Sequence, residues 1–295
     1  MQHILILNVN NVMPNQFKYI LGILFFSCMT ASSFGQKAMD SSREFGLVFG
    51  TGYYIGDLNP DKHFGGDTKL GAGLMYRENF NKRWSVKGQF FYGRIGASDA
   101  RAEDPWMVNR NLSFRNEILE GAIQAELNYV DYQIANKRAK FSPYLFLGIA
   151  LYSHKPQAEF EGKWFDLQPL GTEGQGTTEG GEAYSLNGLA FPFGVGFKFN
   201  LFSIVALSGE WGIRKTYTDY LDDVSGAYVS PVVLATENGQ LSAALSDRSL
   251  SVPDGLTGND GLARGDAGRN DWYSFATLTL SIRLGKPRTS CDWIR

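Results

Sequence analysis

Strict alternation of apolar and polar side chains, repeated along most of the chain, is the feature that most constrains its fold. In DWYSFATLTLSIRLG (271–285), the even positions from Trp272 to Leu284 are mostly apolar and the odd positions are mostly polar. The segments LEGAIQAELNYV (119–130) and AFPFGVGFKFN (190–200) repeat this pattern. A two-residue period with one apolar face predicts β-strands that keep one face out of water.

Segment lengths and connections favour a membrane barrel over a soluble sandwich. We expect about eight strands, near residues 44–56, 69–79, 84–96, 112–132, 141–154, 189–200, 203–217 and 271–285. Long polar loops follow the odd-numbered strands, at 57–68, 97–111, 155–188 and 218–270, and short turns follow the even-numbered ones, at 80–83, 133–140 and 201–202. This arrangement is typical of outer-membrane barrels.

The predicted fold class is therefore all-β: a small transmembrane β-barrel of about eight antiparallel strands, with long outer loops and short periplasmic turns. Tyrosine and tryptophan residues near the strand ends suit the two membrane interfaces. The alternative is a soluble lipocalin-like barrel, which would turn its apolar face inward and its charged face to solvent.

The N-terminal segment has the composition of an export signal. Lys18 precedes an apolar stretch and the small-residue segment SCMTASSFGQK (27–37). We predict a signal peptide over residues 1–35, in which residues 1–12, ahead of Met13, are consistent with a start-site artefact. Lipidation of Cys28 is the alternative to cleavage after residue 35.

Residues 36–295 are then predicted to form one outer-membrane barrel domain with a short periplasmic C-terminal tail. That tail carries the single remaining cysteine, Cys291, so no disulfide within the chain is expected. The formal net charge of −2 gives no electrostatic reason to expect a nucleic acid as partner.

An inward-facing set of charged residues follows from the apolar-out interpretation. A barrel of about eight strands is narrow enough to be filled by its own side chains. Both signs of charge are present, so we expect a structural network rather than a path for ions or substrates. Its predicted members are Arg77, Lys87, Glu120, Glu126, Lys198, Glu210, Arg214 and Arg283, and the uncharged Gln124 is predicted to face inward beside them.

The histidines argue against an enzyme. Lipid acyl chemistry at a barrel surface needs an outward Ser–His pair with a carboxylate to orient it. After the signal peptide only His63 and His154 remain, and Ser153 faces the opposite side of its strand from His154. We expect no catalytic residue and no cofactor.

Several segments resemble a known family. They are YYIGDLNP (53–60), FSPYLFLGIALYSHKPQAEF (141–160), WFDLQPLGTEGQG (164–176), FPFGVGFKF (191–199), TYTDYLDDVSGAYV (216–229) and ARGDAGRNDWYSF (263–275). In this order, over nearly the whole mature chain, they resemble the PorG-type outer-membrane proteins of the type IX secretion system, found in gliding and pathogenic Bacteroidetes.

The resemblance implies a non-enzymatic barrel subunit of the secretion machine. Such subunits associate with a periplasmic ring built from a PorK-like lipoprotein and a PorN-like protein, and they sit in outer-membrane lipid. The alternatives are a structural or adhesive barrel unrelated to secretion and, less favoured, a lipid-modifying enzyme.

The short turns and the tail offer a contact for this ring. They are basic whereas the long loops are acidic, a charge asymmetry that suits an acidic partner face. Contact with anionic headgroups is the alternative explanation. The candidate partner-binding residues are Lys82, Arg83, Lys137, Arg138, Lys140, Lys286 and Arg288.

Three aspartates after the seventh strand, Asp219, Asp222 and Asp223, are weak candidates for metal ligands. A cation would need further oxygen ligands, for which Asn238, Asp247 and Asp254 are available. The spacing matches no EF-hand. The favoured interpretation is that these carboxylates bind loop backbone N–H groups and pair with arginines such as Arg264 or Arg269.

Overall fold

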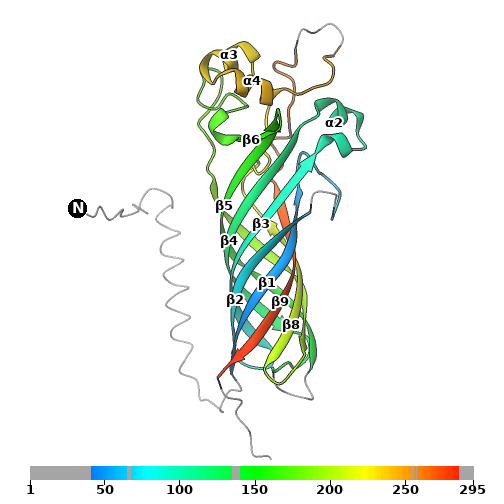
Figure 1. Ribbon diagram of the computed structural model, residues 1–295, viewed down its shortest axis with the longest axis vertical. Helices are drawn as coiled ribbons and strands as arrows, with labels where there is room; N and C mark the ends of the chain where they lie inside the picture. Colours follow the sequence, from blue (N-terminus) through cyan, green and yellow to red (C-terminus); the bar gives the residue numbers. More distant parts are fainter. Residues whose placement is uncertain (1–40, 65–67, 135–139, 254–255, 257, 286–295) are drawn as a thin grey trace, which may run out of the picture. The chain divides into compact units, whose positions relative to one another are not determined.

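The computed structural model describes residues 41–64, 68–134, 140–253, 256 and 258–285 (Figure 1). The predicted signal peptide and the tail with Cys291 lie outside these residues. So do five of the residues named above: Lys137, Arg138, Asp254, Lys286 and Arg288.

Eight antiparallel strands form a closed ring. They are β1 (Ser42–Ile55), β2 (Lys69–Asn79), β3 (Trp84–Ser98), β4 (Ser113–Asn128), β5 (Phe141–Phe160), β7 (Asn187–Asn200), β8 (Val205–Lys215) and β9 (Trp272–Leu284). Each strand pairs with its sequence neighbours in the ring, β4 pairs directly with β5, and β1 pairs with β9. The predicted all-β barrel of about eight strands is confirmed.

The barrel keeps its apolar face outward. On β5 the side chains of Leu145, Leu147, Ile149 and Leu151 are all at least half exposed, and on β9 the apolar residues alternate with buried Thr277, Thr279 and Ser281. A soluble protein rarely exposes so large an apolar surface, whereas lipid requires it. The lipocalin-like alternative is therefore wrong, and the chain is an integral outer-membrane β-barrel.

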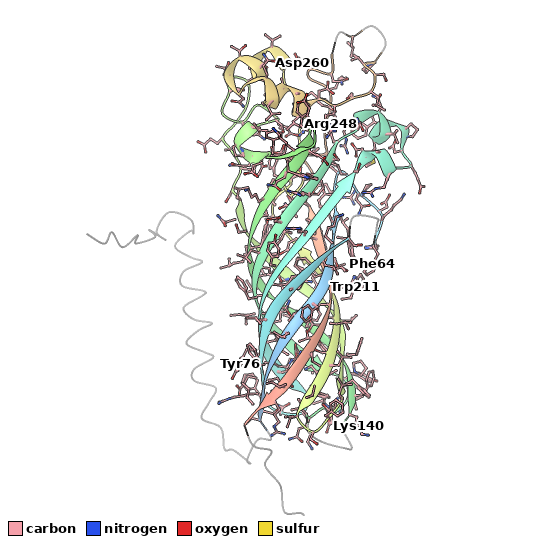
Figure 2. All side chains as sticks on the ribbon, in the orientation of Figure 1. Phe64, Tyr76, Lys140, Trp211, Arg248 and Asp260 are labelled. Atoms are coloured by element: carbon pink, nitrogen blue, oxygen red, sulfur yellow. The ribbon has the colours of Figure 1, made fainter. Side chains whose placement is uncertain are left out.

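The exposed apolar side chains form a band around the barrel, which we call the apolar belt. Outward-facing ion pairs mark its two edges. Arg43 pairs with Glu78 at 3.0 Å near the short turns, and Arg94 pairs with Glu117 at 2.9 Å toward the long loops. Figure 2 places Tyr76 and Trp211 along the wall between Lys140 at the turn end and Arg248 at the loop end.

The long-loop end is more ordered than the sequence predicts. β5 runs to Phe160 rather than to residue 154, and it pairs there with β6 (Lys163–Asp166) as a hairpin above the ring. The strand continues because the inside–outside alternation continues, with Pro156 and Ala158 facing inward.

Short helices lie within three of the predicted long loops. They are α2 (Pro105–Arg110), α3 (Pro231–Glu237), α4 (Gln240–Ser246) and the 3₁₀ turns η3 (Asp99–Arg101) and η4 (Gln168–Leu170). The start of α2 follows local chemistry, because Asp104 accepts a hydrogen bond from the Trp106 N–H and proline takes the first helical position.

No helix among the described residues has the length and apolarity needed to span a membrane.

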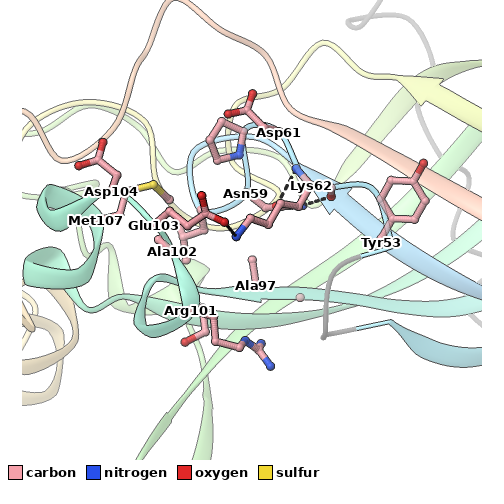
Figure 3. A pocket seen from close by; sticks show the side chains of 14 residues that line it. Tyr53, Asn59, Asp61, Lys62, Ala97, Arg101, Ala102, Glu103, Asp104 and Met107 are labelled. Atoms are coloured by element: carbon pink, nitrogen blue, oxygen red, sulfur yellow. Dashed lines mark hydrogen bonds and ion pairs between the residues drawn. The ribbon is translucent and has the colours of Figure 1, made fainter.

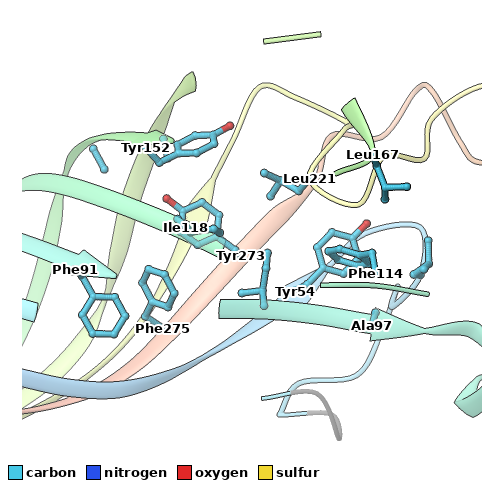
Figure 4. Close-up of a cluster of buried hydrophobic side chains, with 14 of the residues drawn as sticks. Tyr54, Phe91, Ala97, Phe114, Ile118, Tyr152, Leu167, Leu221, Tyr273 and Phe275 are labelled. Atoms are coloured by element: carbon cyan, nitrogen blue, oxygen red, sulfur yellow. The ribbon is translucent and has the colours of Figure 1, made fainter. Parts of the chain in front are cut away.

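An aromatic core fills the barrel toward the long loops. Figure 4 shows its rings in a row, from Phe91 and Phe275, whose centroids are 4.7 Å apart, to Tyr54 and Phe114 at 4.9 Å. Leu221, from the loop after β8, packs into the same cluster. The loops are therefore anchored inside the barrel mouth rather than lying over it.

The apolar belt makes a testable prediction about Leu147, which is 67% exposed at mid-belt. Leu147→Arg should lower the free energy of unfolding by about 2–4 kcal/mol because it places a cation in the hydrocarbon. The control Glu159→Arg, on the same strand but beyond the belt, should change it by less than about 0.5 kcal/mol. Denaturant unfolding in phospholipid vesicles measures the free energy of unfolding of both variants. Equal stability of the two would contradict the position of Leu147 in a lipid-facing apolar belt.

Candidate functional site

The lumen holds a buried ion-pair network, which we call the lumen network: Glu44, Arg77, Lys87, Glu126, Lys198 and Glu210. The strand register explains how it assembles. Glu44 stands opposite Arg77 on the adjacent strand, and Arg77 stands opposite Lys87 on the next. The strand alternation points all of them inward, where lipid cannot reach.

Contacts within the lumen network cross the barrel. Arg77 donates to Glu44 at 3.0 Å and to Glu126 at 3.2 Å, both on its own side of the ring. Lys198 on β7 reaches Glu126 at 2.6 Å, and Lys87 on β3 bonds Glu210 on β8. Since side chains from opposite walls meet, the network fills the cross-section at this level.

A second buried pair lies closer to the aromatic core. Arg214 donates to Glu120 at 3.2 Å, and the Tyr273 hydroxyl donates to the same carboxylate at 2.8 Å. The Arg214 guanidinium also lies over the Phe275 ring, 4.7 Å from its centroid. This cation–π contact partly replaces the water that the guanidinium loses.

Two further residues predicted to face the lumen, Gln124 and Arg283, form no ion pair with the lumen network. Gln124 is fully buried, and its side-chain amide has no hydrogen-bond partner among the described residues. Arg283 is only half-buried at the turn end and donates to the Ile134 carbonyl at 3.0 Å rather than to a carboxylate. Glu44 was missed by the sequence analysis, although it occupies an even, inward position in β1.

The described residues of the four long loops form a second polar centre, which we call the outer cap. Asp222 and Asp271 share one donor there, because the Tyr54 hydroxyl lies 2.5 Å from Asp222 and 2.7 Å from Asp271. Asp222 also accepts from the Val224 N–H, and Asp271 from the Leu221 N–H. Both carboxylates thus fix the backbone of the loop after β8.

Asp223 ties the same loop to the loop after β5. It has a left-handed backbone (φ 67°), and its carboxylate accepts hydrogen bonds from Thr172 and from the Tyr184 hydroxyl. Its carbonyl accepts a 2.6 Å hydrogen bond from Arg264. The carboxylate that pairs with Arg264 is Glu173, at 2.9 Å, rather than one of the three aspartates.

A buried Asp99–Arg110 pair joins the other loops. Arg110 contacts Asp99 at 2.7 Å and donates to the carbonyls of Asp57 and Arg264 at 2.9 and 2.7 Å. One guanidinium therefore links the loops after β1, β3 and β8. The sequence analysis missed this residue, because nothing in the spacing of Asp99 and Arg110 marks them as a buried pair.

The predicted cation ligands do not converge. Asn238 donates to the carbonyls of Gly171 and Gln175, and Asp247 accepts from Ser249 and Asn259. Arg269, predicted as a partner for the aspartates, instead donates to the Pro60 carbonyl. Within the described part of the chain, no three acidic, histidine or cysteine side chains form a cluster able to hold a metal ion.

Burial shifts the titration of the outer cap. It raises the pKa of Asp219 to about 7, an effect that Ser225 partly offsets and that the Asp57 and Glu173 carboxylates reinforce. Burial raises the pKa of Asp223 to about 6 against the opposing pull of Arg264. The pKa of Asp222 is also raised well above its ordinary value by burial.

Three of the predicted partner-binding residues, Lys82, Arg83 and Lys140, lie among the described residues of the turn end. Arg83 pairs with Asp131 at 2.6 Å, and the Lys82 carbonyl accepts from the Tyr132 N–H. Lys140, directly before β5, is exposed. The turn end therefore presents cations, one of which already has a partner within the chain.

Comparison with known families identifies the chain. A family model described as "Domain of unknown function (DUF6089)" matches residues 18–229, well over half of the sequence. The chain belongs to the DUF6089 family. The matched range includes the lumen network and most of the outer cap of this DUF6089 barrel. No curated protein is similar enough to count as a match.

Solved structures of bacterial outer-membrane proteins resemble this DUF6089 barrel at low identity. Ail of Yersinia pestis is 14% identical with a TM-score of 0.37, over 83% of this chain and 97% of its own. OprG of Pseudomonas aeruginosa is 11% identical with a TM-score of 0.35, over 85% and 99%. Neisserial surface protein A is 7% identical with a TM-score of 0.35, over 83% and 99%.

Breaking the lumen network should destabilise the barrel without opening it. Glu126→Ala leaves Arg77 and Lys198 without their shared carboxylate, so the free energy of unfolding should fall by about 3–5 kcal/mol. The control Glu182→Ala, at an exposed loop position, should change it by less than about 0.5 kcal/mol. Unfolding in vesicles and current across planar bilayers test this, and a stable, ion-conducting Glu126→Ala barrel would refute the structural role.

The outer cap should be more stable at low pH. Folding raises the pKa of Asp219 to about 7 and of Asp223 to about 6, above the value near 3.9 expected in an unfolded chain. The folded cap therefore binds protons more tightly, and its stabilisation is complete below pH 4 and is lost as the pH rises through 6 and 7. Hydrogen exchange of residues 216–229, corrected for intrinsic rates, should show more protection at pH 5 than at pH 8.

Asp219→Asn provides the control for this pH dependence, since an amide approximates the protonated carboxyl and does not titrate. The variant should flatten the change in protection between pH 6 and pH 8. Protection that increases with pH, or an unchanged profile in the variant, would show that these carboxyls do not govern the cap.

Proposed function

We propose that this protein is a non-enzymatic outer-membrane barrel component of the type IX protein secretion machinery, which anchors or contacts the periplasmic ring complex. The observation that carries a non-channel role is the lumen network. Its buried charges meet across the barrel, through contacts such as Lys87 with Glu210. A barrel filled in this way suits an anchor better than a conduit for exported proteins.

The segments that resemble PorG-type proteins support the assignment through their shared role in the outer cap. Tyr54 belongs to YYIGDLNP, Glu173 to LGTEGQG, Asp222 to TDYLDDVS and Asp271 to ARGDAGRND. The Tyr54 hydroxyl on β1 contacts Asp222 and Asp271 in the loop after β8, and Glu173 in the loop after β5 accepts a hydrogen bond from the Ser225 N–H. The resembling residues thus act as one structural unit in this chain.

The surroundings of the histidines support a non-enzymatic role. His154 faces the barrel interior, where its ring lies 3.1 Å from the Asn116 amide, while Ser153 faces outward. His63 contacts the Tyr53 hydroxyl at 3.1 Å. Neither histidine is therefore paired with a serine in the way that acyl transfer needs.

The proposed partners are a PorK-like lipoprotein and a PorN-like ring protein, contacted at the short-turn end. Lys82, Arg83 and Lys140 lie there, and the sequence adds Lys137 and Arg138 to the same turn and Lys286 and Arg288 to the tail. Clustered cations steer an acidic partner face and fix its orientation. Outer-membrane lipid completes the environment.

Charge reversal at the turn end tests this proposal. Replacing Lys137, Arg138 and Lys140 with glutamate should leave a folded, heat-modifiable barrel but reduce recovery of the lipoprotein by about tenfold or more, and reduce secretion. The loss should be larger at low salt, where surface charges are least screened.

A matched reversal at the opposite end serves as control. Lys155, Lys163 and Lys215 are exposed cations toward the long loops, and their replacement with glutamate should leave recovery of the lipoprotein unchanged. Normal recovery by the turn-end variant would refute contact at the turns. Normal secretion from cells that lack the protein would refute the secretion role and leave a structural or adhesive barrel.

A further inference from the structure

Two hollows on this barrel have different surroundings. The cavity in Figure 3, about 490 Å³ in volume, opens among loop residues such as Leu58 and Met107 at the long-loop end. A second hollow, of about 650 Å³, lies in the wall formed by β7, β8, β9, β1 and β2. We call it the wall hollow, and six of the residues that line it are Phe49, Thr51, Leu70, Trp211, Ala276 and Leu278.

The strand register explains why the wall is hollow at this place. Thr51 on β1 stands opposite Ala276 on β9, so two short side chains lie next to each other on the outer face. Leu70 borders this pair on one side and Trp211 on the other. The side toward the turns is closed by a larger pair from the same two strands, Phe49 and Leu278. Short side chains thus form a floor between taller ones.

The wall hollow faces hydrocarbon. Phe49 lies six residues after Arg43, whose ion pair marks the turn side of the apolar belt, and this spacing corresponds to about 20 Å along the strand. Because barrel strands are tilted, that distance falls within an apolar band about 25 Å tall. Phe49, Leu70 and Leu278 are more than half exposed to this medium. The group that fills the hollow must therefore be apolar, since an empty hollow forfeits dispersion contacts.

An aromatic cluster lies on the outer side of the wall hollow. The Trp211 indole N–H donates to the Tyr53 hydroxyl at 3.0 Å, and this hydroxyl lies 3.1 Å from His63 Nδ1. The Phe64 ring packs against Tyr53 with the two centroids 4.9 Å apart, and Figure 2 places Phe64 and Trp211 at a similar height on the wall. Tryptophan and tyrosine in such positions are typical of the membrane interface. The hollow thus lies beneath the level of the lipid headgroups.

We propose that the wall hollow binds one acyl chain of an anionic, phosphate-bearing membrane lipid, whose phosphate lies at Lys69. Lys69 is exposed, stands opposite Gly52 and directly precedes Leu70 at the rim of the hollow. A lysine ammonium binds phosphate as a point charge, so an anionic headgroup is favoured there. The acyl chain and the headgroup are then recognised by neighbouring residues. This inference does not depend on a role in type IX secretion.

The shape of the wall hollow favours a lipid over a transmembrane helix of another protein. Such a helix is about 10–12 Å wide with its side chains and needs a contact surface that runs through the whole belt. The floor of Thr51 and Ala276 is only two strands wide, about 10 Å, and Phe49 and Leu278 close it on the turn side. A flexible acyl chain fits so short a hollow, and its lipid also supplies the phosphate for Lys69.

Native mass spectrometry of the full chain tests the proposal, after release from nanodiscs of equal parts phosphatidylglycerol and phosphatidylcholine. The unchanged barrel should retain one phosphatidylglycerol. Ala276→Trp fills the floor and should lower the retained fraction about tenfold or more, as should Thr51→Phe on the neighbouring strand. The control Ala125→Trp should not lower it, because Ala125 is an equally half-buried, outward-facing residue on β4, four strands from β9 in the ring.

Charge reversal tests the position of the phosphate. Lys69→Glu should remove the preference for phosphatidylglycerol, whereas Lys163→Glu, at an exposed lysine on β6, should leave it unchanged. The proposal is wrong if both hollow-filling variants retain as much lipid as the unchanged barrel, if Ala125→Trp loses it equally, or if Lys69→Glu keeps the preference. A dimer that both hollow-filling variants abolish would also overturn it and would assign this wall to contact between copies of the chain.

Discussion

Charge pairing across the lumen is the constraint on which the rest of the structure depends. Lipid around the belt requires an apolar outer wall, so each strand must direct its alternate, polar residues inward. A narrow ring gives these residues little room for water, and they must bind one another. Glu126 shows the result, since it meets Lys198 at 2.6 Å and Arg77 at 3.2 Å from two other strands. The same contacts hold the wall together and close its interior.

The outer cap extends this principle beyond the membrane. Its loops enter the barrel mouth with apolar residues such as Leu221, and their polar groups are then buried and need partners. Tyr54 supplies some of those hydrogen bonds by joining β1 to both ends of the loop after β8. Arg110 and Arg264 supply others, and each of them links different loops. Of the three aspartates considered as metal ligands, Asp222 and Asp223 therefore act as acceptors for hydroxyl and backbone donors. Their raised pKa values follow from the same burial.

Because side chains fill the lumen, the two ends of the barrel are the surfaces outside the membrane on which another molecule can bind. The short-turn end presents exposed cations such as Lys140, and the long-loop end presents a cavity lined by the buried side chains of Leu58, Ala97 and Met107. These two surfaces differ in chemistry, since one is charged and the other is largely apolar.

The sequence by itself determined the barrel, because strand period, strand length and the alternation of short and long connections are local properties that lipid makes decisive. It also supplied most of the residues that the tertiary structure brings into the lumen, since inward positions follow from parity along each strand. Tertiary structure alone decided which charges meet, such as Lys87 with Glu210 across the ring. It also decided that Arg110 links three loops, because such contacts depend on loop packing between segments that are distant in the chain.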